Sequence, residues 1–143
     1  DRVDVAGIVR EAAARARERG GKLEVTPKAA ALDVRGDAVW LARLCENLID
    51  NAVEHGEADG AVRVELAEAK GRVIVRVANR GQVAEHVRKR LFRRFVTTRA
   101  DRGGTGLGLA IARAVAEAHG GTVSCSSFGP PEVVFTLTLP SVS

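Results

Sequence analysis

The chain has 143 residues, enough for one domain with a substantial core, and its 45% hydrophobic and 28% charged residues are globular values. The formal net charge is +4, but only 3% of the residues are aromatic and none is tyrosine, which leaves little for stacking on nucleic-acid bases. No apolar run approaches the roughly 20 residues of a membrane span, and residues 1–19 are too charged for a secretory signal, so neither a membrane nor a nucleic acid is the expected partner.

The first part of the chain has two helix patterns separated by short strands. Apolar residues recur with helical spacing over residues 5–19, and alternation over residues 22–26 and 32–34 predicts strands. Asp37 is a suitable N-cap for a second helix, whose apolar stripe continues to Gly56. Both helices are amphipathic and are therefore expected to cover one face of a sheet.

The remainder of the chain alternates strand patterns with further helices. The predicted elements are a hairpin of residues 62–69 and 72–79 around Lys70-Gly71, a short basic helix at 84–95, a loop at 96–104, a helix that ends at His119, and closing strands at 122–127 and 133–139. The expected buried face of the last helix consists of Leu107, Ile111, Ala114, Val115 and Ala118. This order predicts an α+β fold, a two-layer sandwich with about three main helices on one face of a mixed, mostly antiparallel sheet.

The two cysteines do not make a disulfide framework. Cys45 lies on the apolar stripe of the second helix and Cys125 in a strand pattern, which predicts buried, reduced thiols and a cytoplasmic location. The three histidines have no cysteine cluster beside them, so a structural metal site is not expected. The chain begins without methionine, and we expect residues 1–143 to be one domain excised from a longer protein.

Glycine is concentrated in Gly103-Gly104-Thr105-Gly106-Leu107-Gly108-Leu109, which runs directly into the last predicted helix. A glycine-rich turn that opens a helix presents backbone N–H groups and the positive end of the helix dipole, which together form an anion site, most often for phosphate. The alternative is a tight connection without a ligand. Basic residues precede the run, and we interpret them as a rim over a polyphosphate site, with a solvated helix face as the alternative: Arg88, Lys89, Arg90, Arg93, Arg94, Arg99 and Arg102.

A second pattern lies on the helix that follows Asp37. Asn47, Asn51 and His55 recur every four residues and therefore form one row, at the border of the apolar stripe. Asparagine is a poor helix former, so two of them within about one turn favour a functional role over mere decoration of the helix. An amide can bind a metal ion through its oxygen and a phosphate through its NH₂ group.

Residues 47–56 resemble the N box, residues 92–95 (Phe-Arg-Arg-Phe) the F box and residues 104–108 the G2 box of the sensor histidine kinases. These motifs occur in the right order at suitable spacing, and the resemblance covers nearly the whole chain. It is a resemblance to the catalytic, ATP-binding domain with the Bergerat fold, which gyrase and MutL share. It implies ATP and Mg²⁺ as cofactors and phosphoryl transfer in two-component signalling.

The resemblance implies a role for each matching position. Asn51 would hold the Mg²⁺ that bridges the phosphates, Asn47 would contact phosphate or metal, and His55 would lie beside the nucleotide. The two asparagines are the expected catalytic residues, and residues 96–104 would form a mobile lid. The other expected nucleotide-binding residues are Asn79, Gly81, Phe92, Phe95, Thr98, Arg99, Gly104, Thr105, Gly106, Leu107 and Gly108.

One position of the second helix separates two reaction types. Relatives that hydrolyse ATP, such as gyrase, carry a glutamate one turn before the metal-binding asparagine, as the base that activates water. Here that position is Asn47, which cannot take a proton at neutral pH, and Glu46 points about 100° away around the helix. We therefore expect transfer of the γ-phosphoryl group to a protein side chain rather than hydrolysis.

The G1 box departs from the family pattern Asp-x-Gly-x-Gly, whose aspartate accepts a hydrogen bond from the adenine amino group. The best match is residues 79–83, in which Asn79 replaces the aspartate and Val83 the second glycine. Asn79 can accept from adenine, or it can exchange its oxygen and nitrogen and face guanine. The sequence therefore leaves open whether the site distinguishes adenine from guanine.

None of His55, His86 and His119 has the helical sequence context of a phosphoacceptor. The accepting histidine is expected in a homodimeric parent chain or on a partner, with a response regulator as a further partner. Two alternatives remain open: a degenerate, nucleotide-sensing pseudokinase with relaxed purine specificity, and an anti-sigma-factor serine kinase of the same fold. A nucleic-acid module ranks last.

Overall fold

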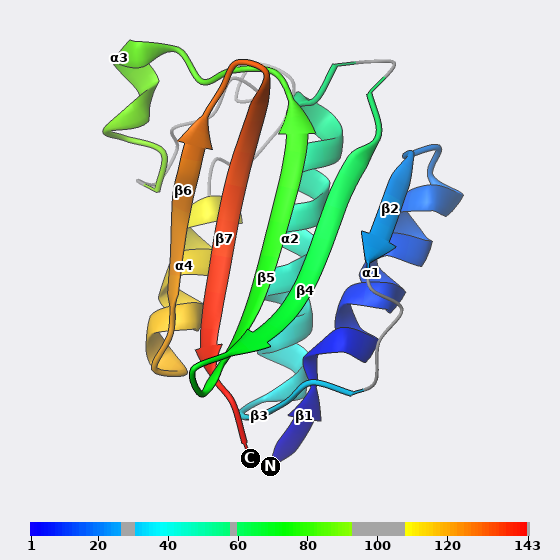
Figure 1. Ribbon diagram of the computed structural model, residues 1–143, viewed down its shortest axis with the longest axis vertical. Helices are drawn as coiled ribbons and strands as arrows, with labels where there is room; N and C mark the ends of the chain where they lie inside the picture. The colour runs from blue at the N-terminus through cyan, green and yellow to red at the C-terminus, as the bar shows by residue number, and fades with distance from the viewer. Residues whose placement is uncertain (27–30, 58–59, 93–107, 143) are drawn as a thin grey trace.

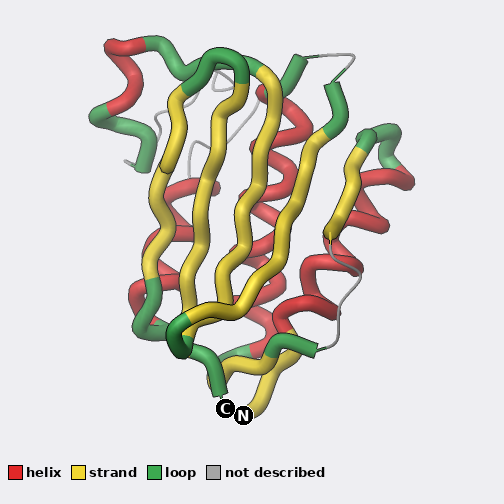
Figure 2. Tube along the Cα trace, in the orientation of Figure 1, coloured by secondary structure: helices red, strands yellow, loops and turns green. Residues whose placement is uncertain are grey.

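The computed structural model describes residues 1–26, 31–57, 60–92 and 108–142. In chain order its elements are β1 (Arg2–Asp4), α1 (Val5–Glu18), β2 (Leu23–Thr26), β3 (Asp33–Arg35), α2 (Ala38–His55), β4 (Val62–Ala69), β5 (Arg72–Arg80), α3 (Glu85–Arg88), α4 (Gly108–Ala118), β6 (Thr122–Phe128) and β7 (Glu132–Pro140). Helices α1, α2 and α4 cover one face of a five-stranded sheet, as Figures 1 and 2 show. The predicted two-layer α+β sandwich is confirmed.

The large sheet has the strand order β2-β4-β5-β7-β6. Strand β2 is parallel to β4, whereas the other three neighbouring pairs are antiparallel, which makes the sheet mixed but mostly antiparallel, as predicted. Strands β1 and β3 form a separate antiparallel pair beside the chain termini. Strand β5 lies at the centre of the sheet, paired with β4 on one side and β7 on the other, so its end is fixed from both sides.

The predicted hairpin of β4 and β5 is confirmed, and its turn is Lys70-Gly71. Both turn residues have positive φ, 53° at Lys70 and 75° at Gly71. Two consecutive positive φ angles define the type I′ turn, whose twist matches that of the strands. Glycine adopts this conformation without the Cβ clash that other residues meet.

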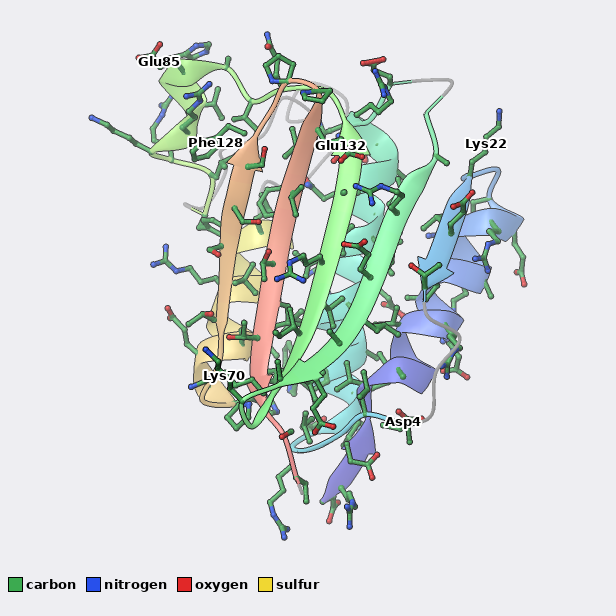
Figure 3. The ribbon with its side chains drawn as sticks, in the orientation of Figure 1. Asp4, Lys22, Lys70, Glu85, Phe128 and Glu132 are labelled. Atoms are coloured by element: carbon green, nitrogen blue, oxygen red, sulfur yellow. The ribbon has the colours of Figure 1, made fainter. Side chains whose placement is uncertain are left out.

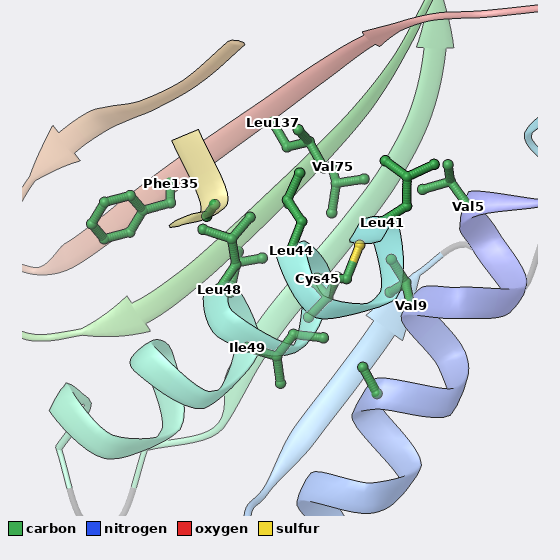
Figure 4. Packing of buried hydrophobic residues seen from close by; sticks show 14 of the residues in the cluster. Val5, Val9, Leu41, Leu44, Cys45, Leu48, Ile49, Val75, Phe135 and Leu137 are labelled. Atoms are coloured by element: carbon green, nitrogen blue, oxygen red, sulfur yellow. The ribbon is translucent and has the colours of Figure 1, made fainter. Parts of the chain in front are cut away.

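Helix α2 forms the centre of the core, between the sheet and α1 (Figure 4). Its buried residues are Leu41, Leu44, Cys45, Leu48, Ile49 and Ala52. On the sheet, Val73, Val75 and Val77 alternate toward the helices, because successive strand residues point to opposite faces. The predicted N-cap is confirmed: the Asp37 side chain accepts from the backbone N–H groups of Val39 and Trp40. A cap of this kind stabilises a helix by about 1 kcal/mol.

His119 joins the end of α4 to the start of α2. Its Nδ1 lies 2.8 Å from the carbonyl oxygen of Val115, and its Nε2 accepts from the backbone N–H of Asp37 at 3.1 Å. Any side chain at Gly36 would collide with the imidazole ring, so glycine is needed there for the close approach. This joint fixes α4 relative to α2, the helix that carries Asn47, Asn51 and His55.

The predicted helix at residues 84–95 is wrong in extent. The helix α3 covers only Glu85–Arg88, and residues 93–95 lie outside the described part. None of its residues is buried, so no packing offsets the repulsion among the like charges of Arg88, Lys89 and Arg90. Arg88 instead bonds the carbonyl oxygen of Val83 through Nε and lies 4.8 Å from the centre of the Phe128 ring.

The predicted buried face of the last helix is also partly wrong. Val115 is buried as expected and Ile111 partly so, but Ala114 and Ala118 are exposed, and Leu107 lies outside the described residues. The fully buried positions are Ala112, Val115 and Ala116. Five of the eleven residues of α4 are alanines, which look alike in the sequence and leave the direction that the helix faces ambiguous. Close packing against α2 buries the face of α4 that carries Ala112 and Ala116.

Both cysteines are free, as predicted; Cys45 is buried as expected, whereas Cys125 is only half-buried. None of the helices in the described ranges is long and apolar enough to cross a membrane.

Candidate functional site

Three segments from distant parts of the sequence meet at one end of the sheet: the end of α2, the end of β5 and the turn between β6 and β7. The backbone N–H of Glu57, just beyond α2, donates to the carbonyl oxygen of Arg80 at the end of β5 at 3.1 Å. The N–H of Gly81 donates to Pro131, in the turn between β6 and β7, at 2.9 Å. In Figure 3, Phe128 and Glu132 mark this end of the sheet, and Lys70 marks the opposite end. The candidate site therefore lies at the carboxyl end of α2.

Asn47 connects the asparagine row to the glycine-rich segment. Its Nδ2 donates to the carbonyl oxygen of Gly108 at 3.1 Å, across 61 positions of sequence. Gly108 is the first residue of α4 and the last glycine of the run. The two motifs predicted to share one site are thus in direct contact, and the Asn47 amide is oriented with its nitrogen toward α4.

The row of Asn47, Asn51 and His55 follows one edge of α2 toward the site. Both asparagines are half-buried and His55 is exposed. Each residue of the row follows the previous one by four positions, so the three side chains lie above one another along the helix. The row therefore places two amides and an imidazole over the last two turns of α2.

Two acidic residues of α2, Glu46 and Asp50, point toward α1. Glu46 forms an ion pair with Arg15 of α1, and Asp50 pairs at 2.8 Å with Arg19, the residue after α1. Glu46 therefore faces α1, in agreement with the angle expected from the sequence. Neither carboxylate belongs to the row of Asn47 and Asn51, so neither is placed there to activate a water molecule.

Asn79 is the one polar side chain in the buried class among the described residues, with 3% of its surface exposed. Its Nδ2 donates to the carbonyl oxygen of Arg80 at 3.2 Å. A Cβ atom at Gly56 would lie 3.1 Å from the Cβ of Asn79, so glycine after α2 allows this close approach. Gly56 itself has an extended backbone.

Gly81 follows Asn79 by two residues and lies beside its amide. Its φ is 147°, a conformation that side chains other than that of glycine rarely adopt. A Cβ atom at this position would lie 3.5 Å from Nδ2 of Asn79 and 3.7 Å from the carbonyl oxygen of His55. The retained glycine of the altered G1 box thus keeps open the space next to Asn79 and the end of α2.

Phe92 is anchored in the core at the edge of the site. Its ring meets Phe135 edge to face, with centroids 6.0 Å apart, and the guanidinium of Arg113 lies 5.4 Å from its centre. Arg113 was missed in the sequence, although it follows Gly108 by five positions on α4. The anchor fixes the chain immediately before residue 93 against both α4 and β7.

The other expected nucleotide-binding residues lie outside the described residues: Phe95, Thr98, Arg99, Gly104, Thr105, Gly106 and Leu107. Their roles, and the lid at residues 96–104, stay predictions. Asn47 meets Gly108 halfway along α2, and Asn79 and Gly81 lie beside Gly56 and His55 at the end of this helix. Asn51 lies on α2 between these two groups.

The residues present fit a magnesium ion that arrives with a nucleotide. Because Nδ2 of Asn47 is turned to Gly108, its Oδ1 remains an acceptor, and Asn51 supplies a second amide one turn later. Mg²⁺ is usually held by one or two protein oxygens together with phosphate and water. In the described ranges no three His, Cys, Asp or Glu residues cluster to hold a metal without such help.

A separate groove of about 420 Å³ lies at the other end of α2. It is lined by Asp1, Arg2, Val3, Gly36, Asp37, Ala38 and Val39. Helix α2 is 18 residues long, and a helix rises about 1.5 Å per residue. Because the groove lies at the start of α2 and His55 at its end, the length of the helix separates them. This groove is therefore not part of the site at His55.

Comparison with known proteins agrees with this geometry. Residues 36–143 match the family described as histidine kinase-, DNA gyrase B- and HSP90-like ATPase. The sensor protein CutS of Streptomyces coelicolor is 37% identical over 147 aligned positions, covering 98% of this chain and 35% of CutS. The sensor protein DivL of Caulobacter vibrioides is 39% identical over 108 positions, covering 75% of this chain and 14% of DivL.

Solved structures of sensor kinases share the whole fold. The mycobacterial sensor histidine kinase MprB has a TM-score of 0.84 at 28% identity, covering 99% of this chain and 98% of that one. The ATP-binding domain of PrrB from Mycobacterium tuberculosis has a TM-score of 0.80 at 26% identity, covering 100% and 98%. Full-length ShkA, solved with AMPPNP, has a TM-score of 0.78 at 32% identity, and this chain covers 31% of it.

The chain belongs to the histidine kinase-, DNA gyrase B- and HSP90-like ATPase family, and it corresponds to the catalytic ATPase domain of bacterial sensor histidine kinases. It spans 14% of DivL and 35% of CutS, about a seventh to a third of these curated relatives. The relatives support the histidine kinase interpretation over the pseudokinase and the anti-sigma-factor kinase.

Proposed function

We propose that this domain binds ATP together with Mg²⁺ and passes the γ-phosphoryl group to a histidine outside residues 1–143. The observation that carries the proposal is the hydrogen bond from Asn47 to Gly108, which unites the amide row of α2 with the glycine-rich start of α4. A helix N-terminus preceded by glycines attracts phosphate, and the amides supply metal ligands beside it.

In this proposal the protein supplies position and charge neutralisation, which are the main contributions to phosphoryl transfer. Asn51 and Asn47 would hold Mg²⁺ through their amide oxygens, and the bound ion would neutralise charge on the phosphates. Both ligands are neutral, so the phosphates of the nucleotide must contribute the negative charge that holds the ion. Asn79 and Gly81 would lie beside the purine base of the nucleotide, and residues 104–108 beside its phosphates.

Transfer is favoured over hydrolysis by the absence of a carboxylate in the asparagine row. Asn47 has no basic atom at neutral pH, and Glu46 is paired with Arg15 on the opposite side of α2. Neither Asn47 nor Glu46 would therefore serve as the general base for a water molecule beside the phosphates. A histidine nucleophile on another domain needs no such base from this chain.

The partners in the proposal are a phosphoacceptor histidine domain and a response regulator. The phosphoacceptor would belong to the same parent chain, which would act as a homodimer. Sensor proteins several times longer than this chain are its relatives, which supports further domains in such a parent. Because ATP is available in the cytoplasm, the domain would act there.

Calorimetric titration with ATP, with and without Mg²⁺, tests binding, and γ-labelled ATP tests transfer to the histidine domain proposed for the parent chain. We expect Mg²⁺-dependent binding, label on that histidine and little free phosphate. A flat titration of the folded chain would refute nucleotide binding. Binding followed only by release of inorganic phosphate would refute transfer as the reaction.

A further inference from the structure

Helices α2 and α4 are hydrogen-bonded to each other at both ends of α4. At the start of α4, Asn47 of α2 donates to the carbonyl oxygen of Gly108 at 3.1 Å. At the other end, His119, the residue after α4, accepts from the backbone N–H of Asp37, the residue before α2. The two helices are therefore antiparallel, with the first half of α2 beside the whole of α4.

Both ring nitrogens of His119 have partners, and these partners define the state of the ring. Nε2 is the acceptor for the N–H of Asp37 at 3.1 Å, so the proton of the neutral imidazole is on Nδ1. Nδ1 donates to the carbonyl oxygen of Val115, one turn earlier in α4, at 2.8 Å. The ring is thus bonded to its own helix on one side and to the start of α2 on the other.

The two backbone segments that His119 joins are well fixed to their own helices. At the end of α4, Gly120 has a φ of 79° and the N–H of Gly121 donates to the carbonyl oxygen of Ala116 at 2.8 Å. These are features of the Schellman motif, which ends helices with a defined geometry. At the start of α2, the side chain of Asp37 caps the helix. His119 therefore bonds one helix end directly to another.

The side chains that α4 buries against α2 between these end contacts are short. Ala112 and Ala116 are both fully buried. Alanine lets two helices approach closely, but it has no atoms beyond Cβ that could interlock with the ridges of a neighbouring helix. The angle between α4 and α2 therefore depends in large part on the hydrogen bonds at the ends of α4.

A small change of this angle would displace the start of α4. The helix has 11 residues. At about 1.5 Å per residue it is about 16 Å long, so a tilt of about 4° around His119 would move Gly108 by about 1 Å. A displacement of about 1 Å, caused far from the reacting groups, is enough to impair a site in which several groups must meet one ligand.

We propose that His119 is a positioning residue, which sets the tilt of α4 against α2 through its hydrogen bond to Asp37. That tilt determines where the start of α4 lies relative to the amides of Asn47 and Asn51. His119 acts from the end of α4 that is remote from the proposed phosphate and Mg²⁺ site. The inference rests on the proposed function, because its consequence for binding is measured at that same site.

Two amide substitutions separate the two hydrogen bonds of His119. The Oε1 of glutamine can reach the position of Nε2, so His119→Gln keeps an acceptor for the N–H of Asp37. Asparagine is shorter and reaches only the position of Nδ1, so His119→Asn keeps the bond to Val115 and loses the bond to α2. The affinity for Mg²⁺–ATP is measured by calorimetry at a temperature at which all three proteins are folded, so that a loss of stability alone leaves the affinity unchanged.

We expect His119→Asn to bind Mg²⁺–ATP at least about threefold more weakly than the unsubstituted protein, and His119→Gln to bind nearly as tightly as that protein. Equal affinities in all three, with a lower Tm for His119→Asn, would show a purely structural residue and would overturn the inference. Equal weakening in both variants would also overturn it, because the acceptor for Asp37 would not be the group that matters. If His119→Asn does not fold, the three affinities are compared in an osmolyte that stabilises folded proteins.

NMR of the nucleotide-free proteins separates failure of this inference from failure of the proposed function. The backbone amide shifts of Gly108 and Leu109 report on the position of the start of α4. We expect both shifts to change in His119→Asn and to be retained in His119→Gln. Unchanged shifts in His119→Asn would overturn the inference even if ATP binds. The expected shift changes in a protein that does not bind Mg²⁺–ATP would support the effect of His119 on α4 and overturn the proposed nucleotide site.

Discussion

Asn47 on α2 donates through Nδ2 to the carbonyl oxygen of Gly108, the first residue of α4, at 3.1 Å. This bond joins two segments that the sequence marks independently, a row of amides and a run of glycines. It also orients the Asn47 amide, since the nitrogen is used by the protein and the oxygen stays an acceptor. The nitrogen of this amide thus holds the protein together, and its oxygen is the group that the proposed function assigns to Mg²⁺.

Replacement of Asn47 by alanine removes both the hydrogen bond to Gly108 and the amide oxygen proposed to bind Mg²⁺. We expect the variant to lose about 1 kcal/mol of unfolding free energy, because the hydrogen bond to Gly108 is gone. Its affinity for Mg²⁺–ATP should fall by about tenfold or more. Urea denaturation and calorimetry measure the two effects. Arg43→Ala, at an exposed position one turn earlier on α2, is the control and should change neither.

Asn51→Ala should separate metal binding from stability. Alanine is the better helix former, so the helix should persist while the amide oxygen for Mg²⁺ is lost. We expect ATP binding that no longer depends on Mg²⁺, measured by titration with and without the ion. The neighbouring variant Asp50→Ala removes only an exposed ion pair with Arg19 and should keep the dependence. Magnesium-dependent affinity in folded Asn51→Ala would contradict the role of this residue.

Gly81→Ala and Gly71→Ala form a matched pair at opposite ends of β5. Both glycines have positive φ, 147° and 75°, so each substitution should cost about 1–2 kcal/mol of stability. Only the Cβ at position 81 would approach the amide of Asn79 and the carbonyl of His55. We expect weaker ATP binding in Gly81→Ala alone. Equal affinities in the two variants would place the base elsewhere.

The stability of the domain should fall at alkaline pH because of Cys45. Burial, and to a lesser extent the charge of Glu46, raises the pKa of this thiol from 9.0 to about 12. The unfolded chain therefore loses the proton first, so this contribution is constant below pH 9 and is lost between pH 9 and 12. The slope approaches about 1.4 kcal/mol per pH unit.

Urea denaturation from pH 8 to 11 measures this slope, and Cys45→Ala is the comparison. The chain has no tyrosine, so fewer other groups titrate in this range. The variant should be less stable at pH 8, because it leaves a cavity, but its stability should fall less steeply above pH 9. The same slope in both proteins would show that Cys45 is not the source.

The strongest local signals of the sequence predicted the fold. The apolar stripe of α2 with its cap at Asp37, and the Lys70-Gly71 turn between alternating strands, depend on nearby residues and were confirmed. Where local signals conflict, prediction failed. The segment after Ala84 has good helix formers, but α3 buries none of its residues and ends at Arg88.

The candidate site was predictable in its side chains but not in its backbone groups. Asn47 and Asn51 stand out because asparagine is a poor helix former, and the resemblance to the family motifs also names Asn79. The carbonyl oxygens of Gly108 and Arg80, which orient two of these amides, have no sequence signal, because every residue carries a carbonyl. Their roles depend on which strand and helix ends meet, and only the tertiary structure supplies that.

The central claim is that the row on α2, the end of β5 and the start of α4 enclose one nucleotide. Backbone amide chemical shifts, recorded by NMR during titration with Mg²⁺–ATP, test it most directly. We expect the largest changes at residues 47–56, 79–81 and 108–110, and little change at the Lys70-Gly71 turn. No change on addition of nucleotide, or changes centred on the groove beside Val39 at the other end of α2, would contradict the account.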